Sequence, residues 1–186
     1  MRTAGFVLAG GNSSRMGRDK AKLPVPSGSL VEAIAQKVKE AASTVSLVGP
    51  AARYRDLKIE CIEDLRPALG PLAGIETALA SRRAECNLIV ACDMPNVEAV
   101  WLARLIAEAQ RSGARCLISK DAAGRIHPLC SVWTYECLPF VQHALDENRL
   151  RLLDLLAEIN AGYLTSSDRL LNINTPQEWA AWQLTH

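Results

Sequence analysis

Short runs of apolar residues alternate along the chain with longer stretches in which apolar residues recur every three or four positions. Turn-forming residues bound the short runs, which is typical of buried strands. From this pattern we predict strands at Thr3–Ala9, Val45–Val48, Lys58–Ile62, Asn87–Cys92, Arg115–Ser119, Ile126–Trp133 and Leu170–Ile173.

The stretches between these strands carry the end signals of amphipathic helices. Ser29 and Glu32 form a capping box ahead of an apolar stripe, and Thr175, Pro176 and Glu178 give the same kind of start near the C-terminus. We predict the remaining helices after Gly70-Pro71, from Asn96 as the N-cap to near Gly113, and over Leu138–Leu145 and Leu150–Ile159.

This alternation predicts an α/β fold, a three-layer sandwich around a mostly parallel sheet. No internal repeat, low-complexity tract or linker divides the sequence, so we predict one domain that spans residues 1–186. Ligands of such sheets bind beyond the carboxyl ends of the strands. Functional side chains are therefore expected immediately after the predicted strands.

The composition of the 186 residues is that of a globular protein, with 49% hydrophobic and 22% charged residues and a formal net charge of +1. This near-neutral balance argues against a dedicated duplex-DNA binder, which usually carries a basic stripe. No apolar run is long enough to span a membrane. We expect neither nucleic acid nor a membrane as a partner.

Cysteine usage and the N-terminal residues indicate a cytoplasmic protein. The six cysteines include no C-x-x-C pair, so they are expected to be reduced and mostly buried rather than metal ligands. The first predicted strand begins almost at once, without the basic region, longer apolar stretch and cleavage site of a secretion signal.

The segment from Gly10 to Lys20 combines glycines, serines and basic residues directly after the first predicted strand. Glycines allow the backbone to approach a ligand and leave N–H groups to face phosphate oxygens. The segment is not a Walker A loop, because Arg18 rather than a lysine follows Gly17. A surface loop with solvated charges is the alternative, but this combination after a strand favours a triphosphate site.

Two further predicted strands end in carboxylates. The run Asn87–Cys92 is followed by Asp93 and then by Pro95, which forces a turn. Proteins bind Mg²⁺ through one or two carboxylates together with waters and substrate phosphates, so Asp93 is the candidate metal ligand, with a helix cap as the alternative. Glu63 and Asp64 follow Ile62, and the Asp64 carboxylate could accept from guanine N1–H and the 2-amino group together; a solvated acidic turn is the alternative.

The segment L-A-G-G-x-S-x-R-M-G-x-D-K, from Leu8 to Lys20, resembles the signature loop of nucleotidyltransferases, specifically of the molybdenum cofactor guanylyltransferase (MobA-like) family. The resemblance implies a Rossmann-like nucleotidyltransferase fold in which this loop wraps a nucleoside triphosphate. It implies that Lys20, rather than Lys22, contacts the phosphates beside Arg15. The nucleotide-binding residues that it implies are Leu8, Ala9, Gly10, Gly11, Lys20, Asp64 and Asp93, with Lys20, Arg15 and Asp93 as the catalytic group and Asp93 as the metal ligand.

Other segments extend the resemblance to nearly the whole chain. C-D-M-P around Asp93 resembles the family's metal-binding segment, and I-E-D at Asp64 resembles its nucleotide-contacting segment. The L-A-G-G sequence resembles the guanylyl members, whereas cytidylyl relatives tend to carry L-A-A-G. One departure lies after the second predicted strand, where Gly49 and Pro50 stand at the place of an Asn that often contacts the nucleotide in the family.

In the C-terminal half, R-I-H-P-L and L-N-I-N-T-P resemble segments on the side of the family's site that receives the pterin substrate. The resemblance implies an N-terminal half that binds nucleotide and a C-terminal half that binds the acceptor. A packed structural histidine, and capping or turn roles for the asparagines, are alternatives. The candidate acceptor contacts are Gly74, His127, Asn172 and Asn174.

The activity implied by the resemblance is the Mg²⁺-dependent transfer of GMP from GTP to the phosphate of molybdenum-molybdopterin, which forms molybdopterin guanine dinucleotide and pyrophosphate. The alternatives are a cytidylyltransferase on the same cofactor, a nucleotidyltransferase on a sugar or cobinamide phosphate, and a non-catalytic GTP-binding regulator. The family also implies transient contact with a molybdenum-insertion enzyme or with a client apoenzyme or its chaperone.

Overall fold

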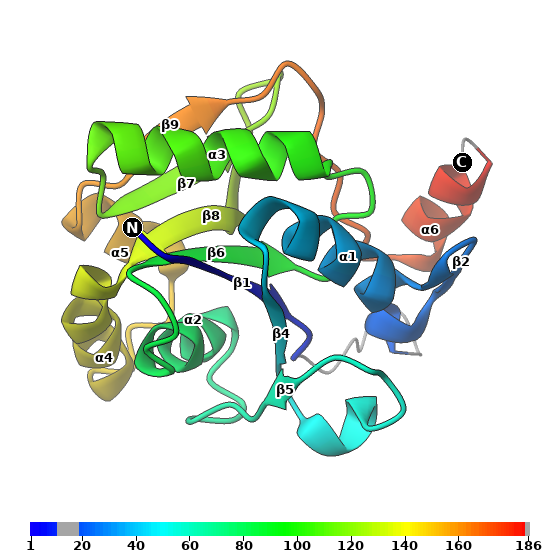
Figure 1. The fold of residues 1–186 in the computed structure, drawn as a ribbon, viewed down its shortest axis with the longest axis horizontal. Helices are drawn as coiled ribbons and strands as arrows, with labels where there is room; N and C mark the ends of the chain where they lie inside the picture. Colours follow the sequence, from blue (N-terminus) through cyan, green and yellow to red (C-terminus); the bar gives the residue numbers. More distant parts are fainter. Residues whose placement is uncertain (11–18, 185–186) are drawn as a thin grey trace.

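A seven-stranded sheet forms the centre of the protein in the computed structural model, which describes residues 1–10 and 19–184 (Figure 1). Its strands lie in the order β5-β4-β1-β6-β8-β7-β9. Their bounds are Thr3–Leu8 for β1, Val45–Val48 for β4, Cys61–Ile62 for β5, Cys86–Ala91 for β6, Cys116–Lys120 for β7, Ile126–Thr134 for β8 and Gly162–Thr165 for β9.

The sheet is mostly parallel, as the alternating pattern predicts. Strand β1 pairs in parallel with β4 on one side and with β6 on the other, so that Leu8 lies opposite both Val48 and Ala91. Strand β8 is antiparallel to its neighbours β6 and β7. The chain leaves β1 toward β4 and returns on its other side as β6, which creates a switch point at the carboxyl end of β1, where ligands of such sheets bind.

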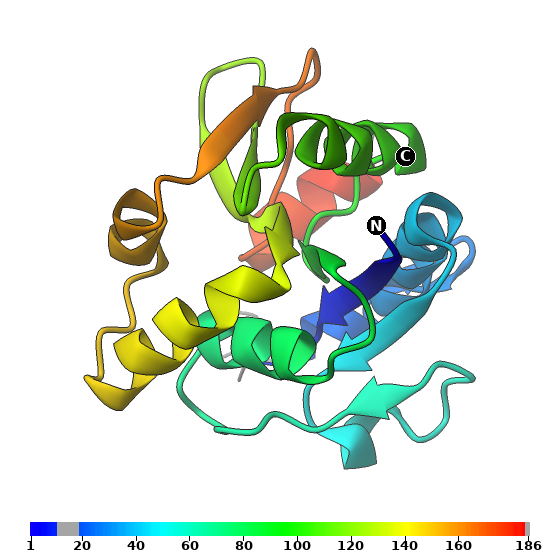
Figure 2. The same cartoon turned by 60° about the vertical axis from the view of Figure 1, so that its left-hand side comes forward.

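Helices cover both faces of this sheet (Figures 1 and 2). Helices α1 and α3 lie together on one face, and α2 and α4 lie together on the other, each pair over its own apolar core. Helix α6 carries Trp179, which is buried against the first core and stacks on Trp182. The bounds are Leu30–Ala42 for α1, Pro71–Ala80 for α2, Ala99–Ser112 for α3, Leu138–Asp146 for α4, Leu152–Glu158 for α5 and Pro176–Gln183 for α6.

Short elements complete the described chain. Strands β2 and β3 form a small antiparallel hairpin before α1. The 3₁₀ helix η1 precedes that hairpin, η2 follows β4 and η3 leads into α4. Their bounds are Pro24–Val25 for β2, Gly28–Ser29 for β3, Lys20–Lys22 for η1, Ala51–Tyr54 for η2 and Tyr135–Cys137 for η3.

The predicted helix ends are confirmed where a local signal sets them. Ser29 and Glu32 form the capping box of α1, and Thr175 and Glu178 form that of α6. Gly113 ends α3 in the left-handed conformation with φ of 67°, which a glycine adopts without a steric penalty.

The predicted strand at Leu170–Ile173 is wrong, and the strand that completes this edge of the sheet is β9. Leu170 and Ile173 are buried, which explains why their run reads as a strand. The backbone N–H of Ile173, however, donates to the carbonyl of Asp93 at 2.8 Å instead of to a neighbouring strand. The run at Lys58–Ile62 is also shorter than predicted, since only its last two residues form β5.

The predicted N-cap of the third helix is wrong as well. Helix α3 begins after Glu98, and Asn96 lies in the preceding turn. The Asn96 side chain instead donates to the carbonyl of Arg169 and accepts from the backbone N–H of Leu171 at 2.8 Å. Asn96 therefore holds the segment between β9 and α6 against the turn that follows β6.

No helix among residues 1–10 and 19–184 is long and apolar enough to cross a membrane. All six cysteines are free, as predicted, and four of them are buried.

Candidate functional site

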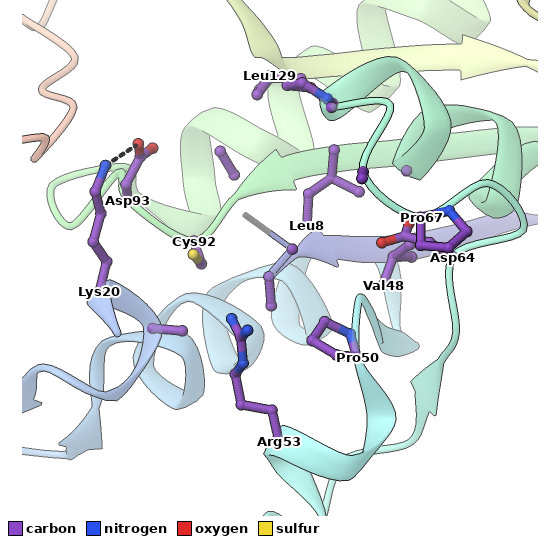
Figure 3. Close-up of a pocket in the computed structure, with 18 of the residues that line it drawn as sticks. Leu8, Lys20, Val48, Pro50, Arg53, Asp64, Pro67, Cys92, Asp93 and Leu129 are labelled. Carbon is purple, nitrogen blue, oxygen red and sulfur yellow. Dashed lines mark ion pairs between the residues drawn. The ribbon is translucent and has the colours of Figure 1, made fainter. Parts of the chain in front are cut away.

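A cavity of about 830 Å³ opens at the carboxyl ends of β1, β4 and β6, as the switch point predicts (Figure 3). Its described walls come from the residues after these strands, from η1 and η2, and from the loop between β5 and α2. Lys20 and Asp93 lie at one end of the view and Asp64 at the other. The charged side chains that line it are Asp19, Lys20, Arg53, Glu63, Asp64, Arg66 and Asp93.

The floor of the cavity is backbone at the end of β1. Ala9 donates its N–H to the carbonyl of Val48 at 2.9 Å, and the buried Tyr54 hydroxyl donates to the carbonyl of Ala9 at 2.7 Å. A Cβ at Gly49 would lie 2.9 Å from the nitrogen of Gly10, and Gly49 has a φ of 153°. Only a glycine fits there, so Gly49 allows the segments that follow β1 and β4 to pack directly against each other.

Lys20 and Asp93 form an ion pair at the end of β6, with 3.7 Å between Nζ and Oδ2 (Figure 3). Their side chains are 17% and 19% exposed. Burial raises the pKa of Asp93 above its usual range, although the hydrogen bond from Asn172 and the charge of Lys20 act in the opposite direction. The ionised carboxylate is thus held under an energetic penalty, which a bound cation would relieve.

Both asparagines of the L-N-I-N-T-P segment form hydrogen bonds with the Lys20–Asp93 pair. Asn172 donates from Nδ2 to Asp93 Oδ1 at 3.0 Å, and Lys20 donates from Nζ to Asn174 Oδ1 at 2.8 Å. The predicted acceptor residues Asn172 and Asn174 are therefore brought to the same point as the predicted catalytic residues Lys20 and Asp93.

Cys92 precedes Asp93 and lines the same cavity, but its thiol is not a nucleophile. Burial, followed by the negative charges of Asp93 and Asp19, raises its pKa to about 12. A thiol with that pKa stays protonated at neutral pH and is unreactive.

Asp64 lies on the loop after β5, at the far end from Asp93 (Figure 3). Its carboxylate is half-buried, and burial followed by the charge of Glu63 raises its pKa. A Cβ at Gly10 would lie 3.2 Å from Asp64 Oδ2, so this glycine allows the carboxylate to approach the β1 backbone. The N–H of Leu65 donates to Thr77 Oγ1 at 3.0 Å, which fixes the loop to α2.

The sequence analysis did not find two further cations that line the cavity, Arg53 and Arg66. Arg53 points from η2 into the cavity and forms an ion pair with Asp19, with 3.7 Å between Nε and Oδ2 (Figure 3). Arg66 lies 3.1 Å from the buried Glu76 of α2. Neither arginine belongs to a recognisable motif; the only signal is that each follows soon after a strand that ends at the cavity.

The residues present suit Mg²⁺ better than a metal held entirely by protein. The described residues contain no group of three or more His, Cys, Asp and Glu side chains placed to hold a metal ion. The Asp93 carboxylate faces the cavity and could provide one oxygen ligand, and substrate phosphates and waters usually complete the octahedron of Mg²⁺.

The other predicted site residues are placed as follows. Leu8, Ala9, Gly10 and Gly74 line the cavity, and a Cβ at Gly74 would lie 3.1 Å from Leu8 Cδ2. The His127 side chain is only 2% exposed, and its ring nitrogens face Asn172 and Asp121. The predicted residues Gly11 and Arg15 lie outside the described residues.

The chain is similar to known proteins over most of its length. A model of the MobA-like NTP transferase domain matches residues 5–160. A protein of Flavobacterium johnsoniae named "probable molybdenum cofactor guanylyltransferase" is 30% identical over 177 residues, which cover 93% of this chain and 92% of the relative. The molybdenum cofactor guanylyltransferase of Xanthomonas euvesicatoria is 33% identical over 184 residues, with 95% and 92% coverage. The fold is similar to that of the molybdopterin-guanine dinucleotide biosynthesis protein A of Archaeoglobus fulgidus, with a TM-score of 0.83 and 23% identity over 98% of this chain and 97% of that chain.

Proposed function

The chain belongs to the MobA-like NTP transferase family of nucleotidyltransferases, and from this premise we propose that it transfers GMP from GTP to the phosphate of molybdenum-molybdopterin. An oxygen of the acceptor phosphate attacks the α-phosphorus of GTP, the bond between the α-phosphorus and its bridging oxygen breaks, and pyrophosphate leaves. The product is molybdopterin guanine dinucleotide. The names of the relatives support this choice of nucleotide and acceptor.

One observation carries the proposal: a single cavity holds a Lys20–Asp93 pair at one end and a half-buried Asp64 at the other. A nucleoside triphosphate has a matching polarity, with its phosphates at one end and its base at the other. The carboxylate of Asp64 accepts from guanine N1–H and the 2-amino group. Cytosine does not offer that pair of donors on one edge.

The triphosphate end is the proposed reaction centre. Lys20 neutralises phosphate charge, and Arg15 and the Gly10-Gly11 backbone are proposed to hold the phosphates beside it. Transfer of a nucleotidyl group asks for little covalent chemistry from the protein, so most of the rate comes from the alignment of the two phosphates and from the neutralisation of developing charge.

Asp93 is the proposed ligand of Mg²⁺, and the donor set described above supports that choice. When bound, the ion neutralises charge that develops on the α-phosphate and orients the triphosphate. The raised pKa of Asp93 also supports the proposal, because it shows a carboxylate held without full compensation of its charge.

The acceptor is proposed to bind on the side of Asn172 and Asn174, so that residues 1–186 act as one domain with a nucleotide half and an acceptor half. The contacts of both asparagines with Asp93 and Lys20 support this arrangement, because the acceptor phosphate must reach the α-phosphate. Gly74 is a proposed contact from the cavity wall. We place the reaction in the cytoplasm, with a molybdenum-insertion enzyme and a client apoenzyme or its chaperone as transient partners.

The proposal is tested by pyrophosphate release with Mg²⁺ and molybdenum-loaded molybdopterin, measured in parallel with GTP, CTP, ATP and UTP. We expect release with GTP and formation of the guanine dinucleotide. Release with CTP alone would refute the base assignment to Asp64. If no nucleotide gives pyrophosphate release with molybdopterin, but release occurs with a sugar or cobinamide phosphate, the proposed acceptor is refuted. GTP binding without turnover on any acceptor would show a binding protein instead of an enzyme.

A further inference from the structure

His127 is too deeply buried to contact a substrate. Its side chain is 2% exposed, and both ring nitrogens have protein partners. Nδ1 lies 3.0 Å from Asn172 Oδ1, and Nε2 lies 3.2 Å from Asp121 Oδ2. Any part that this histidine plays in the reaction must therefore pass through those partners.

Asp121 anchors the far end of this contact chain. Its side chain is also 2% exposed, and its Oδ1 accepts from the backbone N–H groups of Ala123 at 3.0 Å and Arg125 at 2.9 Å. Burial opposes ionisation, but these backbone hydrogen bonds and the bond from His127 outweigh it and lower the pKa of Asp121. Asp121 is thus an ionised carboxylate that the backbone fixes beside His127 Nε2.

Asn172 connects His127 to Asp93, and the chemistry of the two ends fixes its orientation. An ionised carboxylate accepts hydrogen bonds and has none to donate, so the Asn172 amide turns its NH₂ group to Asp93, at 3.0 Å. Its carbonyl oxygen then faces His127 Nδ1, which must donate. The His127 ring therefore donates from Nδ1 to Asn172, Asn172 donates to Asp93, and Asp93 pairs with Lys20.

We propose that Asp121 and His127 are positioning residues for the transfer reaction. Together they fix the orientation of the Asn172 amide, so that Asn172 binds Oδ1 of Asp93 while Oδ2 of Asp93 faces Lys20. This proposal deepens the proposed function and rests on it. The two ends of an asparagine amide have nearly the same shape, so only its hydrogen-bond partners fix which end faces which group. Without the donor on His127, the amide is free to turn its oxygen toward Asp93, where two oxygens repel each other and the carboxylate loses its support.

Two substitutions of His127 separate this role from a merely structural one. In His127→Asn, the amide nitrogen takes the place of Nδ1 and can still donate to Asn172. In His127→Gln, the amide nitrogen reaches the place of Nε2, so the contact with Asp121 is kept and the donor to Asn172 is lost. Ser131→Ala is a matched control, because Ser131 lies on the same strand, is fully buried, and donates to the carbonyl of Pro128.

Four quantities are measured for each variant: kcat and KM for GTP, the binding of Mn²⁺ to the GTP complex by electron paramagnetic resonance, the melting temperature, and the ¹H–¹⁵N signals of the Asn172 side chain without nucleotide or metal. We expect His127→Gln to lower kcat and Mn²⁺ affinity by about 10- to 100-fold, with little change in KM. Its Asn172 signals should shift. His127→Asn should recover most of both losses, and Ser131→Ala should lower the melting temperature while kcat stays unchanged.

Equal losses in His127→Asn and His127→Gln would overturn the proposal, as would wild-type Mn²⁺ affinity and unshifted Asn172 signals in His127→Gln. Losses of kcat that simply follow the melting temperature in all three variants would also overturn it. The Asn172 signals require neither substrate nor metal. An inactive wild-type protein would therefore refute the proposed function, while those signals still decide whether His127 orients Asn172.

Discussion

At the scale of single residues, the buried carboxylate of Asp93 sets the stability of the fold against the metal-binding role proposed for it. Burial raises its pKa more than Asn172 and Lys20 lower it, so the folded protein carries the ionised side chain at a net cost. Functional carboxylates are often retained in this state, because a buried charge that binds a cation well destabilises the folded protein when no cation is bound.

We predict that Asp93→Asn raises the melting temperature and lowers kcat by at least about 100-fold, because it removes a buried charge together with the proposed metal ligand. The stability gain depends on pH in a definite direction. A carboxyl group whose pKa is raised by folding stabilises the protein below its unfolded pKa, and this contribution is lost as the pH rises through the folded pKa. The melting-temperature difference between the variant and the wild type should therefore grow with pH across the acidic range.

Calorimetry at several pH values and steady-state kinetics check this prediction. A variant that melts lower than the wild type at neutral pH would show that the bonds to Lys20 and Asn172 outweigh the burial of Asp93.

Asp64 gives a second prediction at this scale, which concerns the choice of base. Asp64→Asn replaces one of two acceptor oxygens by a donor, so one guanine hydrogen bond to a charged group is lost. Such bonds contribute about 1.5–3 kcal/mol, and we expect kcat/KM for GTP relative to CTP to fall by about 10- to 100-fold. Competition assays with both nucleotides measure the ratio. An unchanged ratio would place base recognition elsewhere in the cavity.

At the scale of elements, Asn96 determines where the segment between β9 and α6 lies. It joins Arg169 and Leu171 to the turn after β6, and the next residues of the segment reach Asp93 and Lys20. A side chain in a turn thus positions part of the proposed reaction centre without lining the cavity.

We predict that Asn96→Ala lowers kcat by about 10-fold while KM for GTP changes little, since the segment carries Asn172 onto Asp93 but the described cavity walls stay intact. Gln110→Ala is the matched control, because Gln110 also makes two hydrogen bonds from α3, to Met1 and Thr3. Both variants should lose comparable stability in thermal denaturation. If the control loses as much kcat as Asn96→Ala, the effect is one of general stability.

The elements that could be predicted are those fixed by local chemistry. The capping boxes at Ser29 and Thr175 and the glycine at position 113 set helix ends from neighbouring residues alone. Strand β9 and the loop at Leu170–Ile173 could not be told apart in this way. Both contain apolar residues, and the choice between them depends on which segment finds the free edge of β7.

At the scale of the whole molecule, the family resemblance of the Leu8–Lys20 segment is confirmed. Lys20, Asp64 and Asp93 could be singled out because each follows a strand, and the carboxyl ends of parallel strands meet at one edge of the sheet. Arg53 and the contact of Asp121 with His127 could not be found from the sequence. They depend on side-chain packing between segments that share no motif.

A ligand that binds only the folded protein should stabilise the whole molecule by an amount that grows with the logarithm of its concentration relative to Kd. At a GTP concentration of about 100 times Kd, we predict a gain of about 2.7 kcal/mol in the free energy of unfolding, or a rise of about 5–10 °C in melting temperature. The rise should be larger with Mg²⁺ than with a chelator and should be lost in Lys20→Ala. Differential scanning fluorimetry measures it, and equal shifts with and without Mg²⁺ would argue against a shared metal and nucleotide site.

The antiparallel strand β8 has a consequence for synthesis of the protein. β6 is buried along its whole length and pairs with β8, yet α3, β7 and the connecting loops are translated between them. About 40 residues must follow β6 before β8 is finished, which takes about 2–8 s at ordinary rates of translation. During that interval the nascent chain presents an apolar strand edge that is open to pairing with other chains. This protein should therefore be most prone to aggregation, and most dependent on chaperones, while its second half is still being made.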